Sequence, residues 1–151
     1  MKLKLLLVGE LDSTDNAFRN QLNSMINKDQ DIIEYGFRND IKNLLKSSDC
    51  LVLPSYREGF PNVILQAGAM GKPVVISDVN GSDDYIIEGV NGVIFRKGDV
   101  LSLKNALLYI IEERFNWSQE KIIEILSEKF NQVDYYNSLI KFYKSTVNSP
   151  T

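Results

Sequence analysis

Histidine is absent from this 151-residue sequence, and Cys50 is its single cysteine. These absences exclude a zinc site built from histidine and cysteine, a Ser-His-Asp triad and a Cys-His pair. A lone cysteine also excludes an internal disulfide, which is typical of a protein in the reducing cytosol. Any chemistry must therefore use carboxylates, lysines, arginines, hydroxyls, amides or backbone N–H groups. We expect a cytoplasmic protein.

The sequence also lacks a strong charge of one sign and any long hydrophobic run. Its net charge of −3 gives no basic patch, so we expect no nucleic-acid partner. The opening "MKLKLLLVGE" is too short and too polar at its end for a signal peptide, and no stretch approaches the roughly 18 apolar residues of a membrane span. With 44% hydrophobic and 25% charged residues, the chain has the composition of one globular domain, residues 1–151.

Short apolar runs rich in β-branched residues alternate with helical patterns as far as about residue 115. This alternation predicts an α/β protein with a doubly wound parallel sheet, Rossmann-like, with helices on both faces. The expected strands are Leu3 to Gly9, Ile32 to Gly36, Cys50 to Pro54, Pro73 to Ser77 and Val93 to Phe95. The expected helices between and after them are Asp15 to Asn27, Asp40 to Lys46, Pro61 to Met70, Asp83 to Glu88 and Asp99 to Glu113.

Two further helices are expected at the carboxyl end, from Ser118 to Lys129 and from Gln132 to Lys144. The second carries a wide aromatic stripe, formed by Tyr135, Tyr136, Leu139, Phe142 and Tyr143. We favour packing of this stripe against the sheet; the alternative is contact with another domain.

The most informative stretch is "SYREGFPNVILQAGAMGKP", because it joins a loop at the predicted ligand edge of the sheet to a helix. Pro61 suits the first helical position, and Gly71 suits the left-handed cap at the helix end. The start of such a helix favours an anion. Glu58 at the same place has two readings: a surface charge that satisfies the helix start, or a carboxylate that binds sugar hydroxyls. Gly59 would let the backbone approach a ligand.

Gln66 lies about a turn and a half into this helix. It is either an ordinary helix residue or an amide that binds hydroxyls deeper in the crevice.

The stretch "PSYREGFPNVILQAGAMGKPVVISDVNGSDDYIIEGVNGVIF" closely resembles the carboxyl-terminal, donor-binding domain of GT-B fold, family 4 retaining glycosyltransferases (glycosyl transferases group 1). The resemblance extends through "GFRNDIKNLLKSSDCLVLPS" to both ends of the chain. It implies the carboxyl-terminal half of a GT-B fold with extra terminal helices. It also implies transfer of a sugar from a nucleoside diphosphate sugar to a glycan or lipid-linked acceptor, as in capsule or O-antigen synthesis.

The resemblance further implies roles for individual residues. Glu58 would be the catalytic residue that binds hydroxyls of the transferred sugar, and the donor sugar and diphosphate would lie against Glu58, Gly59, Phe60, Pro61 and Asn62. Gln66 stands where the family has a second glutamate that binds the ribose, so ribose binding is expected to be weaker. Gly36, Phe37 and Arg38 would face the nucleobase. The resemblance also implies that no metal ion or other cofactor is needed.

The resemblance also implies missing parts. A glycine-arginine and lysine pair that clamps the diphosphate in this family would precede residue 1, as would an amino-terminal domain that binds the acceptor. We therefore expect this domain alone to be inactive or nearly so, and to meet a membrane only peripherally, at its inner face, if at all.

Three competing interpretations remain open. Within enzymes these are a GT-B sugar phosphorylase and a nucleotide-sugar epimerase. Outside enzymes, a flavodoxin-like module could bind a nucleotide or a protein in the same crevice.

Overall fold

The computed structural model describes residues 3–10, 16–113 and 116–147. The chain divides into two compact units, Met1–Ile41 and Lys42–Thr151. In the part of the chain that the structure describes, all three strand pairings are parallel, which confirms the predicted α/β class. The strands form two sheets, one of two strands and one of three.

The first unit contains β1 (Leu5–Val8), α1 (Asn16–Lys28) and β2 (Ile32–Gly36). β1 pairs with β2 in a register that sets Leu5 opposite Ile32. Gly36 ends β2 with a φ of 62°, a left-handed conformation that glycine adopts without strain, and its carbonyl accepts a 2.8 Å hydrogen bond from the Gly9 N–H. The predicted start of α1 at Asp15 lies outside the described residues.

The second unit holds a sheet in the order β3-β4-β5 and the helices around it. Its elements, with α2 at the boundary between the units, are α2 (Ile41–Ser47), β3 (Leu51–Leu53), α3 (Asn62–Ala69), β4 (Val74–Ser77), α4 (Ser82–Tyr85), β5 (Gly92–Phe95), α5 (Val100–Glu112), α6 (Gln119–Lys129) and α7 (Gln132–Val147). Each strand and helix lies within a few residues of its predicted range.

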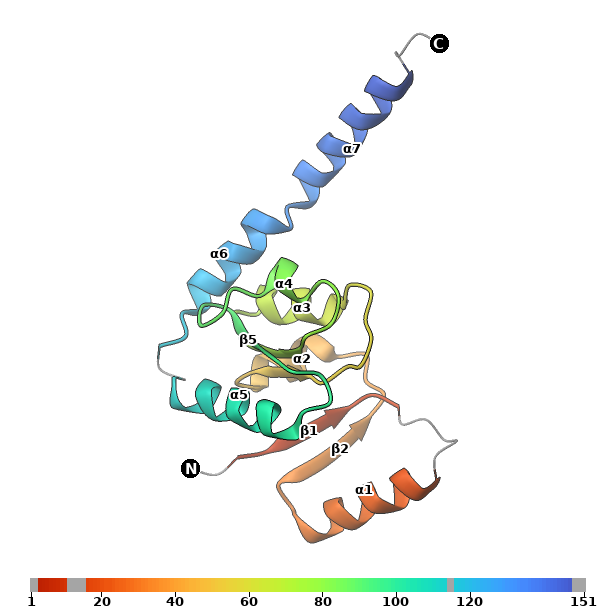
Figure 1. Ribbon diagram of the computed structural model, residues 1–151, viewed down its shortest axis with the longest axis vertical. Coiled ribbons are helices and arrows are strands. Elements are labelled where there is room, and N and C mark those ends of the chain that lie inside the picture. The colour runs from red at the N-terminus through yellow and green to blue at the C-terminus, as the bar shows by residue number, and fades with distance from the viewer. Residues whose placement is uncertain (1–2, 11–15, 114–115, 148–151) are drawn as a thin grey trace. The chain divides into compact units, whose positions relative to one another are not determined.

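The central strand β4 is buried along its whole length because helices cover both of its faces. Figure 1 shows α5 on one side of this sheet and α3 on the other. On the α5 side, Val75 packs with Phe95, Ala106 and Ile110. Side chains alternate along a strand, so Val74 and Ile76 point to the α3 side. This rigid centre fixes the positions of the loops that follow each strand.

Helix α3 ends at Ala69, and Gly71 follows its cap residue Met70, in the left-handed conformation that the sequence predicts. The φ of Gly71 is 65°, and its N–H bonds to the carbonyl of Gly68 at 2.9 Å. A side chain here is excluded for a second reason, since a Cβ would lie 2.8 Å from Cβ of Gln119. The glycine therefore allows the end of α3 to touch the start of α6.

The prediction that the aromatic stripe of α7 packs against the sheet is wrong. Tyr135, Tyr136, Phe142 and Tyr143 are each more than half exposed. Figure 1 shows α7 running away from β3, β4 and β5. Among the described residues, no helix combines the length and the apolar character that crossing a membrane requires.

Candidate functional site

The candidate site lies where β3 and β4 end, in the loop that connects β3 to α3. We call residues 54–61 the Glu58 loop. Parallel strands carry their ligand crevice at their carboxyl ends, so this is the edge where a ligand is expected. Ser77 is the last residue of β4 and is only 1% exposed, whereas Glu58 is partly exposed.

Two hydrogen bonds connect the buried strand to the carboxylate of Glu58. Ser77 Oγ donates to the carbonyl oxygen of Ser55 at 2.5 Å. Ser55 Oγ in turn donates to Glu58 Oε1 at 2.5 Å. Among the described residues, no hydrogen bond to Glu58 Oε2 is found. The carboxylate is thus oriented through one oxygen and keeps acceptor capacity on the other.

Neither the backbone conformation nor the packing of the described residues requires a glycine at position 59. Its φ is not positive, and an added Cβ would meet nothing within 4 Å. Its carbonyl oxygen instead lies beside Gly81 in the loop after β4, where a Cβ on Gly81 would be 3.4 Å away. The space next to Gly59 is therefore open to a ligand.

The start of α3 differs from the predicted one by one residue. Pro61 precedes the helix as its N-cap, with φ −75° and ψ 110°, and the helix begins at the exposed Asn62. Proline has no side-chain oxygen, and no side chain caps this end of α3 in the described chain. The first N–H groups of α3 therefore retain the capacity to bind an anion.

Gln66 is exposed, while its neighbours Ile64 and Ala67 on α3 are fully buried. Its amide therefore belongs to the solvent side of the helix and is not used for packing. Its predicted contact with a ribose remains a prediction.

Gly36, Phe37 and Arg38 belong to the first unit. The Phe37 side chain is 66% exposed. Arg38 forms a two-pronged ion pair with Asp40, at 2.7 Å from Nε and 2.8 Å from Nη2, and its Cζ lies 5.7 Å from the centre of the Tyr35 ring. The hydrogen bond from Arg38 lowers the pKa of Asp40. The carboxylate of Asp40 and the ring of Tyr35 thus hold Arg38 beside the end of β2.

A separate hollow of about 480 Å³ lies where α6 meets α7, and neither Glu58 nor any other residue of the Glu58 loop lines it. Its walls include Leu65 of α3, Phe130 and Tyr135. In residues 3–10, 16–113 and 116–147, no group of three metal-binding side chains comes together.

Sequence reasoning missed Ser55 and Ser77. A serine three residues before a carboxylate in a loop predicts a contact between the two only weakly, because its hydroxyl can also bond to several nearby backbone groups. Only the fold shows that one serine reaches the carboxylate and that the other holds the loop.

Comparisons with known proteins agree on the family. The family described as "Glycosyl transferases group 1" matches residues 1–113. The capsular polysaccharide biosynthesis glycosyltransferase CapM of Staphylococcus aureus is 27% identical over 111 residues, which is 74% of this chain and 29% of that protein. The lipopolysaccharide 1,6-galactosyltransferase of Escherichia coli is 34% identical over 99 residues, covering 65% of this chain and 27% of the relative.

A solved structure gives the same result for the fold. The crystal structure of HepE from Anabaena in complex with UDP superposes with a TM-score of 0.83 at 26% identity, over 95% of this chain and 41% of HepE. This chain thus spans less than a third of the two sequence relatives and under half of the structural one. The match over residues 1–113 covers most of the chain, which therefore belongs to the glycosyl transferases group 1, with the α/β architecture of GT-B enzymes.

Proposed function

We propose that this chain is the donor-binding domain of a retaining glycosyltransferase. The whole enzyme would move a sugar from a nucleoside diphosphate sugar to a glycan or a lipid-linked acceptor. The observation that carries the proposal is the Glu58 carboxylate, which Ser55 orients beside the uncapped start of α3. A carboxylate that binds hydroxyls next to a helix start that favours a diphosphate suits a nucleotide sugar.

The proposed roles follow from this arrangement. Glu58 Oε2 accepts hydrogen bonds from hydroxyls of the donor sugar, and the N–H groups at the start of α3, near Asn62, approach the diphosphate. Stabilisation of the departing diphosphate is electrostatic, so no side-chain nucleophile is needed. No metal ion takes part in the proposed reaction.

UDP is the proposed nucleotide, because the HepE structures contain UDP and UDP-glucose. Gln66 would contact the ribose through a neutral hydrogen bond, and Gly36, Phe37 and Arg38 would face the base. Acceptor recognition requires a further domain in this proposal. We therefore expect the isolated chain to bind a donor and to transfer little sugar.

The test is a calorimetric titration with UDP, GDP, ADP and UDP-glucose. The wild-type chain and the Glu58→Ala variant are compared, with Glu112→Ala on the exposed face of α5 as a control. We expect saturable binding that prefers UDP. Loss of charge-assisted hydrogen bonds in Glu58→Ala should weaken UDP-glucose by roughly 10- to 100-fold and leave UDP nearly unchanged.

Two results would contradict this proposal. If UDP-glucose and UDP lose affinity equally in Glu58→Ala, Glu58 does not bind the sugar. If the amides of the Glu58 loop show no NMR shift at millimolar UDP-glucose, the donor-site proposal is wrong for this chain.

A further inference from the structure

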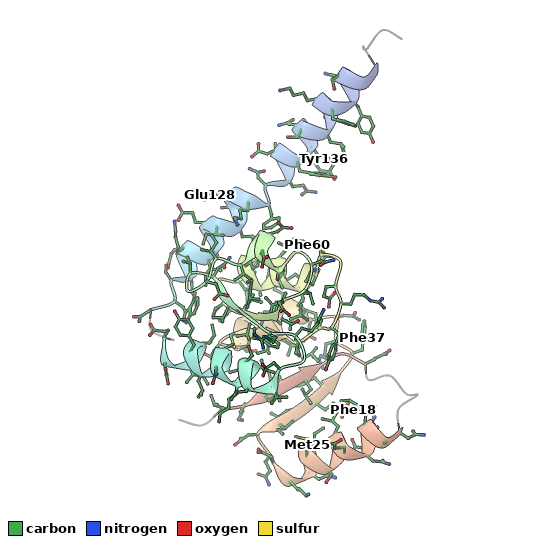
Figure 2. All side chains as sticks on the ribbon, in the orientation of Figure 1. Phe18, Met25, Phe37, Phe60, Glu128 and Tyr136 are labelled. Atoms are coloured by element: carbon green, nitrogen blue, oxygen red, sulfur yellow. The ribbon has the colours of Figure 1, made fainter. Side chains whose placement is uncertain are left out.

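A ring contact connects the Glu58 loop to the end of α6. The rings of Phe60 and Phe130 lie with their centres 5.4 Å apart and their planes tilted by 49°. Phe60 is two residues from Glu58, and Phe130 follows the last residue of α6. Figure 2 shows Phe60 on the side of the core where α6 ends. Residues 70 positions apart in the chain thus meet beside the candidate site.

Phe130 is held by the core beneath it. Its N–H bonds to the carbonyl oxygen of Leu126 at 2.9 Å. Its ring also lies 5.8 Å from the ring of Tyr85, which is fully buried. The neighbouring Lys129 Nζ donates to the carbonyl oxygen of Asp84 at 3.2 Å. The Phe130 ring therefore presents a fixed surface to Phe60.

Helix α6 itself is firmly attached to α3. Ile122 and Ile125 are buried, and Leu126 lies against Gly68 of α3. The Glu58 loop leads directly into α3, so one end of the loop and its aromatic partner Phe130 are both tied to the same pair of helices. Movement of Phe60 relative to Phe130 would require the loop to move relative to both helices.

We propose that Phe130 is a positioning residue that holds the Glu58 loop in the geometry that binds the donor. This inference rests on the proposed function and extends it to a residue distant in sequence. Phe60 remains 39% exposed, and nothing lies within 4 Å of the position that a Cβ on Gly59 would take, so few side-chain contacts restrain this part of the loop. Without its ring partner the loop samples more conformations, and donor binding must then supply the ordering free energy. Aromatic pairs of this kind are strong enough to decide such a balance.

The test compares Phe130→Ala with Phe130→Tyr, which keeps the ring. Tyr135→Ala is the matched control, since Tyr135 lines the same hollow as Phe130 but its ring makes an edge contact with Tyr136 and none with Phe60. Calorimetry gives the affinity for UDP-glucose well below the melting temperature, so that only folded protein is measured. NMR relaxation of the Gly59 and Phe60 amides, without ligand, reports the order of the loop.

We expect Phe130→Ala to weaken UDP-glucose binding by about three- to tenfold and to lower the amide order parameters of the loop. Phe130→Tyr should keep both the affinity for UDP-glucose and the order parameters near their wild-type values, and Tyr135→Ala should change neither. Unchanged order parameters and affinity in folded Phe130→Ala would overturn the proposal. If that variant does not fold, Phe130→Leu, which keeps the apolar volume without the ring, gives the same comparison.

Failure of this inference can be told apart from failure of the proposed function. If wild-type protein does not bind UDP-glucose, the proposed function fails, while the relaxation data on ligand-free protein still show whether Phe130 orders the loop. If wild type binds and Phe130→Ala binds equally well with an equally ordered loop, the role of Phe130 alone is refuted.

Discussion

Ser55 contacts Glu58 with its hydroxyl, which donates a 2.5 Å hydrogen bond to Oε1, while its carbonyl oxygen accepts another from Ser77. One residue thereby joins the buried end of β4 to a partly exposed carboxylate. The orientation of Glu58 is set by the sheet before any ligand arrives, which reduces the rotamer entropy that binding would otherwise cost.

Replacing Ser55 by alanine should therefore impair sugar binding more than nucleotide binding. The variant loses a hydrogen bond to a charged group, which is worth about 1.5 kcal/mol at a partly exposed site. We expect affinity for UDP-glucose to fall by roughly tenfold, with UDP affected little. Calorimetry with both ligands measures the difference.

Ser48→Ala is the matched control for this prediction. Ser48 is also partly buried, and its hydroxyl bonds to the Leu45 carbonyl at the end of α2. It should leave both affinities unchanged. Equal weakening of UDP and UDP-glucose in Ser55→Ala would show that the serine supports the loop generally and does not orient Glu58.

The local order of strands and helices could be predicted because it depends on short-range patterns. Pro61 and Gly71 bracket α3 in the sequence, and the helix occupies the residues between them. The apolar run at β4 predicts a strand buried on both faces, as found. The pattern of neighbouring residues is enough to specify these features.

The surroundings of α7 and of Glu58 could not be predicted in this way. A stripe such as that of Tyr135 and Tyr136 shows that one helix face is aromatic, but not what covers it; both side chains are exposed. The hydrogen bond from Ser77 to Ser55 spans 22 residues, and hydroxyls bond equally well to local backbone and water. Such contacts follow from the sheet register, which periodicity does not give.

Asn91 should be essential for stability. It is fully buried, its Oδ1 accepts the Ile87 N–H at 2.7 Å, and its Nδ2 donates to the Tyr85 carbonyl at 2.9 Å. Asn91→Ala leaves both backbone groups without these partners, so we expect a loss of about 2–3 kcal/mol in the free energy of unfolding. Urea denaturation measures it. Asn105→Ala on the exposed face of α5 should stay within about 0.5 kcal/mol of wild type.

Gly68 and Tyr85 should be energetically coupled. A Cβ on Gly68 would clash with the Tyr85 hydroxyl and lie 3.1 Å from its Cζ. Gly68→Ala should therefore destabilise the protein by roughly 1–3 kcal/mol, and by about 1 kcal/mol less when Tyr85→Phe removes the hydroxyl. A double-mutant cycle from denaturation data gives the coupling. Additive effects of the two substitutions would contradict this packing.

The Tyr85 hydroxyl should also control stability in alkali. It is buried without a hydrogen-bond partner among the described residues, and burial raises its pKa from an ordinary value near 10 to about 12. The unfolded chain therefore loses this proton at lower pH than the folded one. Ionisation of Tyr85 therefore costs no stability below pH 10, and the free energy of unfolding falls as the pH rises from 10 toward 12.

Wild type should lose on the order of 2–3 kcal/mol more than Tyr85→Phe over this pH range. Below pH 9 the variant should match or exceed wild-type stability, because it removes a buried hydroxyl that has no partner. Parallel alkaline curves for the two proteins would show that the hydroxyl is solvated in the folded state. The comparison isolates Tyr85 because every other titrating group is common to both proteins.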